Sequence, residues 1–307
     1  MIPGRRFPGR LAVIPLMRVA AAALAAAALA GIVACSGGDE QPTLWISGIP
    51  DQDASLLEAR FTALAAYLAE ETGLDVRYVP HDSYAAVVTA FEAGGVHLAW
   101  YGGLAGVQAR LAVPEAEAIA QRPRDAAFHS VFVAAPDSGI TDLAGLRGRT
   151  LTFGSEGSNS GHLMPRFFLR EAGINVERDL AAIGFSGSHD RTWRLVADGA
   201  FDAGALNAVV WEARAAAGEV DRAKVEVFFR TPPYVNYHWV VNRAVDASHG
   251  AGTVDKLRAA LLAIDVSKGG RAQAIAEAFQ TDRFIPTANA NYRPIEEVAR
   301  ELGIIGP

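Results

Sequence analysis

The sequence contains a single cysteine, Cys35, among its 307 residues. One cysteine allows no intrachain disulfide, no thiolate metal cluster and no CxxC redox pair. Thiol chemistry elsewhere in the chain is therefore excluded. Lysine is also scarce, since only three of the 28 basic residues are lysines. This excess of arginine reflects genome composition more than function.

Motifs for common cofactors are absent from the sequence as well. The seven histidines show neither HxH nor HExxH spacing, and no GxxxxGK[ST] or GxGxxG loop occurs. We therefore expect no metal and no cofactor. Low-complexity sequence is confined to the first 40 residues, which argues against repeat and coiled-coil architectures. A composition of 50% hydrophobic and 20% charged residues is typical of a folded chain, and the length predicts about two domains.

Acidic residues are missing from the first 34 positions, which carry four arginines. The apolar run at 19–34 is shorter than the roughly 20 residues of a spanning helix, so residues 1–34 are predicted to be a cleaved signal peptide. The end of this run, IVAC, resembles the lipobox of bacterial lipoproteins. That resemblance implies lipidation of Cys35, a tether over 35–42 and a membrane anchor; an ordinary signal beside a chance cysteine is the alternative.

Charge excludes one class of partner. The whole chain carries a formal net charge of −6, and without the four arginines of the signal the remainder carries −10. Nucleic-acid binding requires a basic face, so no nucleic-acid partner is expected.

Strand and helix patterns alternate from residue 43 onward. Apolar runs at 43–49, 75–80 and 97–103 alternate with helical patterns at 56–73 and 83–95, and a second set of such units follows from 149 to 218. This alternation predicts mainly parallel sheets flanked by helices. We predict an α/β fold of two lobes joined by two crossings, with lobe 1 formed by residues 43–135 and 238–307 and lobe 2 by residues 136–237.

Two loops at strand ends carry polar residues where a ligand of such a fold is expected. Ser158, Asn159 and Ser160 precede a helix, whose first N–H groups lack partners and attract an oxyanion. One of them would suffice as an ordinary helix cap, so three favour the anion interpretation. Ser188 and His189 likewise stand after the next predicted strand, at the start of the helix that follows it.

The first lobe supplies further candidates. Ser83 and Tyr84 begin a helix, and Trp100, Tyr101 and Gly102 end a strand. We expect Trp100 to lie in the core, and Tyr101 to point into the cleft.

These segments together resemble the PhnD-like periplasmic solute-binding proteins of phosphonate, phosphite and related oxyanion ABC transporters, and within them most closely the selenate-transporter branch. The motifs are YAAVV (84–88), HLAWYGG (97–103), FGSEGSNSGHLMPR (153–166), FSGSHD (185–190), FDAGALN (201–207) and TPPY (231–234). The resemblance implies the type II periplasmic-binding-protein fold. It also implies a ligand site at Tyr84, Tyr101, Gly102, Ser158, Asn159, Ser160, Ser188 and His189. Asn159 departs from the commoner threonine.

Aminophosphonate binders of this family carry carboxylates in two segments that here read ALNAVV (205–210) and PYVNYH (233–238). Neither segment contains an acid, so the sequence predicts a ligand without an amine. Asn207, Tyr234 and Tyr237 of these segments are expected to donate to a small anion or to close over it.

The expected function is capture of a small tetrahedral oxyanion by a monomeric, lipid-anchored periplasmic protein that delivers it to an ABC permease and ATPase. A sensory protein that presents its ligand state to a membrane histidine kinase is the alternative. An enzymatic role, known for pyrimidine-synthase relatives of the fold, lacks their cysteine-rich motif and any paired acid and base.

Overall fold

The computed structural model describes residues 42–306, which belong to one compact unit. The predictions for the signal peptide, for Cys35 and for the tether up to residue 41 lie outside the described residues. Within the described part, no helix combines the length and apolar character needed to cross a bilayer.

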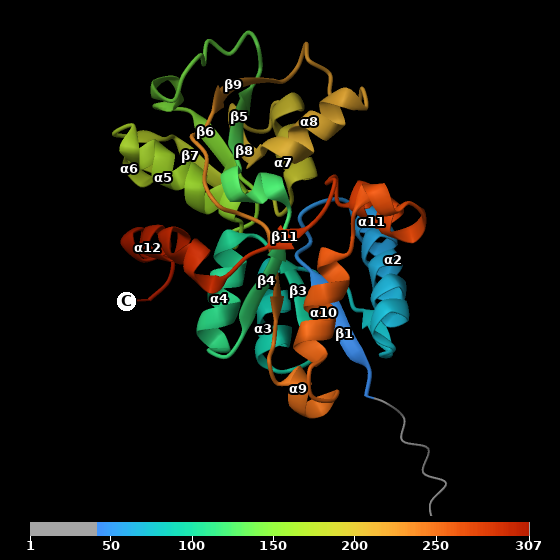
Figure 1. The fold of residues 1–307 in the computed structure, drawn as a ribbon. Helices are drawn as coiled ribbons and strands as arrows, with labels where there is room; N and C mark the ends of the chain where they lie inside the picture. Colours follow the sequence, from blue (N-terminus) through green and yellow to red (C-terminus); the bar gives the residue numbers. More distant parts are fainter. Residues whose placement is uncertain (1–41, 307) are drawn as a thin grey trace, which may run out of the picture. The chain divides into compact units, whose positions relative to one another are not determined.

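The first sheet has the strand order β11-β4-β10-β3-β1-β2. Its strands are β1 (Leu44–Gly48), β2 (Val76–Tyr78), β3 (Leu98–Tyr101), β4 (Glu117–Gln121), β10 (His238–Val241) and β11 (Ile285–Pro286). One face packs against α2 (Ala54–Thr72), α10 (Thr253–Leu262) and α11 (Gly270–Ala278), as Figure 1 shows. The helices α3 (Tyr84–Glu92), α4 (Gly103–Ala112) and α12 (Arg293–Glu301) lie on the other side.

The second sheet has the order β7-β6-β8-β5-β9. It is built from β5 (Ser130–Ala134), β6 (Thr150–Phe153), β7 (Ala182–Phe185), β8 (Ala203–Asn207) and β9 (Glu226–Arg230). Side chains of β5 alternate between two separate cores, because neighbouring residues of a strand face opposite sides. One core includes Leu169 of α5 (Met164–Glu171), and the other includes Trp193 of α7 (His189–Ala197) and Trp211 of α8 (Ala208–Ala216).

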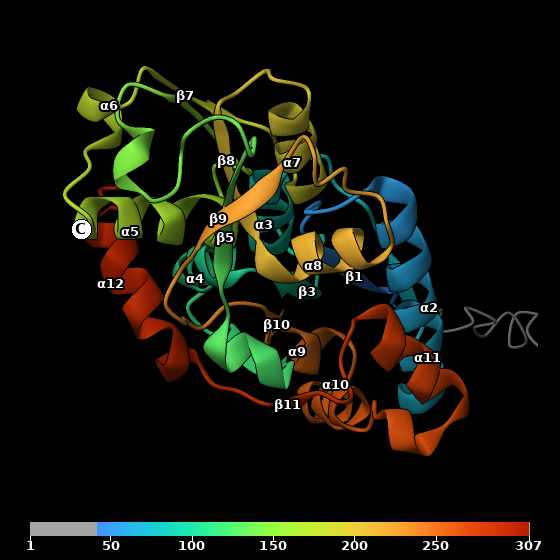
Figure 2. The same ribbon diagram turned by 90° about the horizontal axis from the view of Figure 1, so that it is seen from above.

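Each sheet contains one central strand that runs against its neighbours, β10 in the first and β5 in the second. These are the strands by which the chain enters each lobe from the other. A strand that enters from the edge where the parallel strands end must run antiparallel to them. The two crossing segments also pair with each other through Phe128 and Tyr234. Figure 2 shows β5 and β9, the strands next to this pairing, lying side by side.

The position of β5 corrects one sequence prediction. Residues 129–135 were assigned to lobe 1, but Ser130–Ala134 pairs with β8 and β9 of the second sheet. The apolar run itself was recognised correctly. Its sheet was not, because periodicity reports burial and says nothing about the partner strand.

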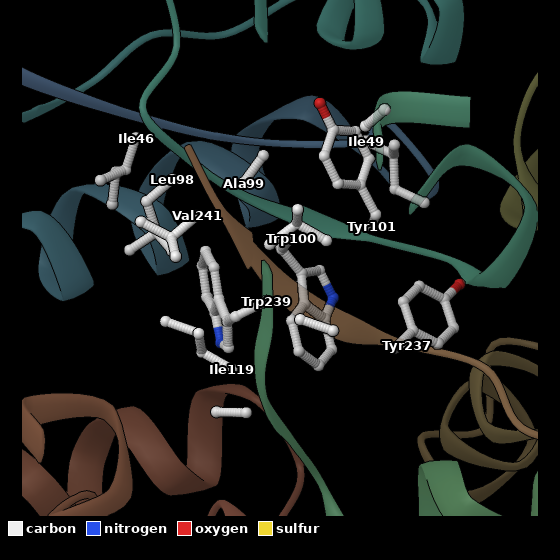
Figure 3. Close-up of a cluster of buried hydrophobic side chains, with 14 of the residues drawn as sticks. Ile46, Ile49, Leu98, Ala99, Trp100, Tyr101, Ile119, Tyr237, Trp239 and Val241 are labelled. Atoms are coloured by element: carbon white, nitrogen blue, oxygen red, sulfur yellow. The ribbon is translucent and has the colours of Figure 1, made fainter. Parts of the chain in front are cut away.

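The core of the first lobe gathers Trp100, Trp239, Phe279 and Phe284, as predicted for Trp100. Figure 3 shows Trp100 and Trp239 within this core. Tyr237 stacks on Trp100 with the ring centroids 5.5 Å apart. The orientation predicted for Tyr101 is wrong: this residue is fully buried, and its hydroxyl donates to the carbonyl of Val87 at 3.1 Å. All four residues of β3 are buried, since helices cover both faces of the sheet.

Candidate functional site

The loop after β6 begins a π-helical turn, Asn159–Leu163, that continues into α5. Ser158 caps this turn by accepting from the N–H of Gly161 at 2.9 Å. The Ser160 carbonyl accepts from the hydroxyl of Ser130 at 2.6 Å. No described residue accepts from the N–H groups of Asn159 and Ser160. The loop is thus both a cap, through Ser158, and a pair of free donors suited to an anionic oxygen.

The loop after β7 lies against the first loop. The Gly187 N–H donates to the Gly154 carbonyl at 3.1 Å, and a methyl group built on Gly161 would approach the His189 ring to 3.1 Å. Glycine is needed at position 161 for this close approach. The structure therefore brings the two predicted loops together.

His189 is fully buried at the start of α7. Burial lowers its pKa below the usual value, so the ring is neutral. Its Nδ1 accepts from the backbone N–H of Asn207 at 3.3 Å, which leaves the proton on Nε2. His189 thus directs its Nε2 N–H toward the oxygen of Tyr237, which lies 3.4 Å away.

Asp51, which follows β1, belongs to the same cluster and was missed by the sequence analysis. Its carboxylate accepts from the Tyr237 hydroxyl at 2.7 Å, and its carbonyl accepts from the His189 N–H at 3.0 Å. The Tyr237 oxygen lies 3.1 Å from the donating Asn207 side chain and 3.4 Å from His189 Nε2. Burial, followed by the Asp51 charge, raises the pKa of Tyr237, which keeps its proton for the bond to Asp51.

A second contact between the lobes involves two asparagines. Asn236 Oδ1 accepts from the Gly103 N–H at 3.1 Å and from Asn159 Nδ2 at 3.0 Å. A methyl group on Gly103 would lie 2.6 Å from Asn159 Nδ2. Glycine at 103 is therefore required for lobe 2 to approach lobe 1 this closely, and Asn159 serves as an interlobe contact.

Tyr84 faces the loop after β6 from lobe 1. A methyl group on Gly157 would lie 3.0 Å from Tyr84, and the Tyr84 hydroxyl is buried without a hydrogen-bond partner among residues 42–306. A cavity of about 780 Å³ opens beside it, lined by residues of both lobes that include Ser83, Tyr84, Gly157, Ser186 and Gly187. The unpartnered hydroxyl is a donor available to a ligand.

The predicted residues divide into three groups. The first group lies where the two lobes meet, with Gly102 beside Asn159 and Asn236, and of its members Tyr84 also lines the cavity; it comprises Tyr84, Ser158, Asn159, Ser160, His189, Asn207 and Tyr237. Ser188 caps α7, and Tyr234 bonds through its hydroxyl to Ser130 and so supports the first loop from behind. Tyr101 lies in the core.

The missed residues are Asp51, Ser130 and Asn236. Asp51 stands immediately after a strand, which is the position where ligand-binding residues were sought.

The position of Asp51 weakens the sequence argument that the ligand carries no amine. Segments 205–210 and 233–238 contain no acid, yet Tyr237 of the second segment holds the Asp51 carboxylate at the cleft. The sequence argument concerned only acids within these two segments, whereas Asp51 follows β1. Across the described part of the chain, no group of three or more His, Cys, Asp and Glu side chains is arranged to hold a metal ion.

Two sheets joined by two crossings, with donors from both lobes at the cleft, define a two-lobed solute-binding protein. The model of one family, ABC transporter phosphonate periplasmic substrate-binding protein, matches residues 46–292. The chain belongs to this family. Membership confirms the two-lobed α/β fold and the role as a periplasmic binding protein of an ABC importer, and it favours transport over the sensory alternative.

Individual relatives agree with this assignment. Probable ABC transporter phosphite binding protein PhnD1 of Prochlorococcus marinus (strain MIT 9301) is 40% identical over 269 residues, which cover 85% of this chain and 90% of that protein. The structure of PhnD1 from this organism in complex with methylphosphonate matches with a TM-score of 0.82 over 86% of this chain and 99% of that chain.

A more distant relative, Phosphate-import protein PhnD of Mycolicibacterium smegmatis, is 29% identical over 78% of this chain and 80% of that protein. A binding protein component of an ABC phosphonate transporter from Pseudomonas aeruginosa, 18% identical with a TM-score of 0.75 over 84% of this chain and 86% of that chain, shows the fold alone.

Proposed function

We propose that this protein captures phosphite or a small phosphonate such as methylphosphonate in the cleft between its lobes and delivers it to an ABC permease and ATPase. The observation that carries this proposal is the presence of unpartnered donors from both lobes where the lobes meet. These are the N–H groups of Asn159 and Ser160 in lobe 2 and the buried hydroxyl of Tyr84 in lobe 1, which packs against the same loop at Gly157. Donors that are fixed before binding hold an anion without further ordering cost.

The names of the relatives support the ligand class, since one is a phosphite binding protein and its counterpart of known structure holds methylphosphonate. Selenate, which the resemblance to the selenate branch suggests, has the same tetrahedral shape. We propose binding without catalysis, because the family and the named relatives are binding proteins of transporters. We further propose that the protein is a monomer anchored through a lipid on Cys35.

A thermal-shift panel on the protein without residues 1–34 tests the ligand class. A ligand at a hundredfold excess over its Kd stabilises the folded state by about 2.7 kcal/mol, which raises the melting temperature by several degrees. Phosphite, methylphosphonate, selenate, sulfate, phosphate and 2-aminoethylphosphonate are compared at one concentration. Stabilisation by phosphite or methylphosphonate supports the proposal, and no stabilisation by either overturns it.

A further inference from the structure

The carboxylate of Asp51 is unusual for an anion site because it is itself negative. Asp51 is 3% exposed and makes no ion pair among the described residues. Tyr237 donates to Oδ2, and no described residue donates to Oδ1. Oδ1 therefore has no donor within the described residues, and it is accessible enough to accept a hydrogen bond from a ligand.

This carboxylate belongs to a residue that lies where the two lobes meet, beside the start of α7. Its own carbonyl accepts from the N–H of His189, which is the first residue of α7. The Asp51 side chain thus lies beside the helix start at which the oxyanion is expected. Its hydrogen bond to Tyr237, which Asn207 supports in turn, fixes the carboxylate in this position.

The groups around Asp51 are drawn from every neighbouring element. Two of these groups are buried cations, Arg60 of α2 and Arg122 of the first crossing. The others are neutral donors, namely Tyr84, His189 and Tyr237. Arg122 is already bound to Asp125, and the Arg60 Nε has no partner. Tyr84 has a hydroxyl free for a ligand oxygen, but no uncharged donor offsets the negative charge that Asp51 adds to that of an anionic ligand.

We propose that Asp51 shares one proton with the bound anion and thereby makes the site select oxyanions that retain an O–H over those that are fully ionised. This inference rests on the proposed function and deepens it by naming the ligand's protonation state. Two negative oxygens in contact repel each other, and desolvation strengthens the repulsion. A proton between them converts the repulsion into a charge-assisted hydrogen bond.

The two ligand classes differ in this proton. Phosphite and methylphosphonate lose their second proton near neutral pH, so a large fraction keeps one O–H. Selenate and sulfate are strong acids and carry no proton at that pH. The Asp51 carboxylate therefore accepts from the first class and repels the second.

Isothermal titration of phosphite, methylphosphonate, selenate, sulfate and 2-aminoethylphosphonate into the wild type and Asp51→Asn tests the inference. The asparagine retains an acceptor for Tyr237 and presents an N–H in place of a negative oxygen. We expect the wild type to prefer phosphite to selenate by at least about a hundredfold, and Asp51→Asn to reduce this preference by about tenfold or more. Asp53→Asn, two residues away, is the matched control, which should change the affinities for all anions by one common factor.

The outcomes separate the inference from the proposed function. If the wild type binds neither phosphite nor methylphosphonate, the proposed function fails. If it binds them but binds selenate equally well, or if Asp51→Asn leaves the preference unchanged, the function stands and the inference is overturned. Loss confined to 2-aminoethylphosphonate would make Asp51 an ammonium ligand and also overturns it.

A second measurement needs no variant and remains decisive if Asp51→Asn does not fold. The affinity of the wild type for phosphite should fall as the pH rises through the second pKa of phosphite, because the protonated fraction falls. The affinity for selenate should show no such fall over the same range. Parallel pH profiles for the two anions contradict the inference.

Discussion

The backbone N–H of Asp53 in lobe 1 donates to the carboxylate of Asp190 in lobe 2 at 3.2 Å. Asp190 is held by Arg214 through two hydrogen bonds of 2.7 and 2.9 Å, and Asp53 is paired in turn with Arg194 at 3.3 Å. Carboxylates and guanidinium groups from both lobes thus form one network at the cleft. The network exists only while the lobes are in contact, so it stabilises that arrangement.

Asp53→Asn should accelerate ligand release about two- to fivefold, because partly exposed ion pairs contribute about 0.2–1 kcal/mol. Asparagine is also a good residue to precede a helix, so α2 is preserved. Stopped-flow measurement of the dissociation rate checks this prediction. Glu296→Gln, which removes a pair with Arg300 inside α12, is the control. Equal dissociation rates for Asp53→Asn and the wild type would show that the network does not hold the lobes together.

Gly103→Ala should weaken anion binding by about tenfold or more while the melting temperature of the free protein changes little. The added methyl group would lie 2.6 Å from Asn159 Nδ2 of the opposite lobe and so prevents full contact of the lobes. The control is Gly95→Ala, where a methyl group meets only the Ala90 carbonyl, at 3.5 Å. Titration calorimetry gives the affinities, and an unchanged Kd for Gly103→Ala would contradict the role of this contact.

Ser160→Ala should weaken anion binding by about tenfold or more, since hydrogen bonds to charged groups contribute about 1.5–3 kcal/mol. Ser158→Ala additionally removes a helix cap, at a cost of about 1 kcal/mol in folding free energy. Ser138→Ala, at a half-buried bend where the hydroxyl accepts from the N–H of Ile140, is the control for loss of a hydroxyl. If calorimetry shows an unchanged anion affinity in the Ser158→Ala/Ser160→Ala double variant, the side chains of this loop only cap the helix and do not bind the anion.

Folding stability should fall as the pH decreases below about 6.5, partly through His162. Burial lowers the pKa of His162 to about 4, and the neutral ring donates from Nδ1 to the Glu156 carbonyl and accepts from Arg166 at Nε2. Between these values the unfolded chain binds a proton that the folded chain does not. Each such histidine then costs up to about 1.4 kcal/mol per pH unit. Urea unfolding of His162→Asn should give a shallower pH dependence, and an unchanged slope would exclude His162 as a cause.

Cys35 should carry a diacylglyceryl group in cells, because the sequence before it resembles a lipobox. Mass spectrometry of the membrane fraction is the measurement, and Cys35→Ser should release the protein from that fraction. A mature N-terminus at another residue would contradict the lipid anchor and leave the binding function untouched.

The fold followed from the sequence because its signals are local. The elements expected at 43–49, 56–73, 75–80, 83–95 and 97–103 lie within a few residues of those found, and the two polar loops were recognised from serines and glycines that precede helices. Asp51 and Asn236 could not be found in this way. Their importance lies in contacts with residues that are distant in the chain, such as His189 and Gly103. Tyr101 was misjudged for the same reason, because its hydroxyl partner Val87 belongs to another element.

The pairing of Phe128 with Tyr234 has a mechanical consequence. Two connections that lie side by side permit one lobe to rotate against the other about the line through both connections. They resist twisting and sliding of the lobes against each other. Ser130, next to this pairing, holds the Ser160 carbonyl, so the anion loop turns rigidly with lobe 2. Opening would therefore break three contacts between the lobes in one movement: Asp51 with His189, Asp53 with Asp190 and Gly103 with Asn159. The protein would then present the transporter with two distinct conformations, one with ligand and one without.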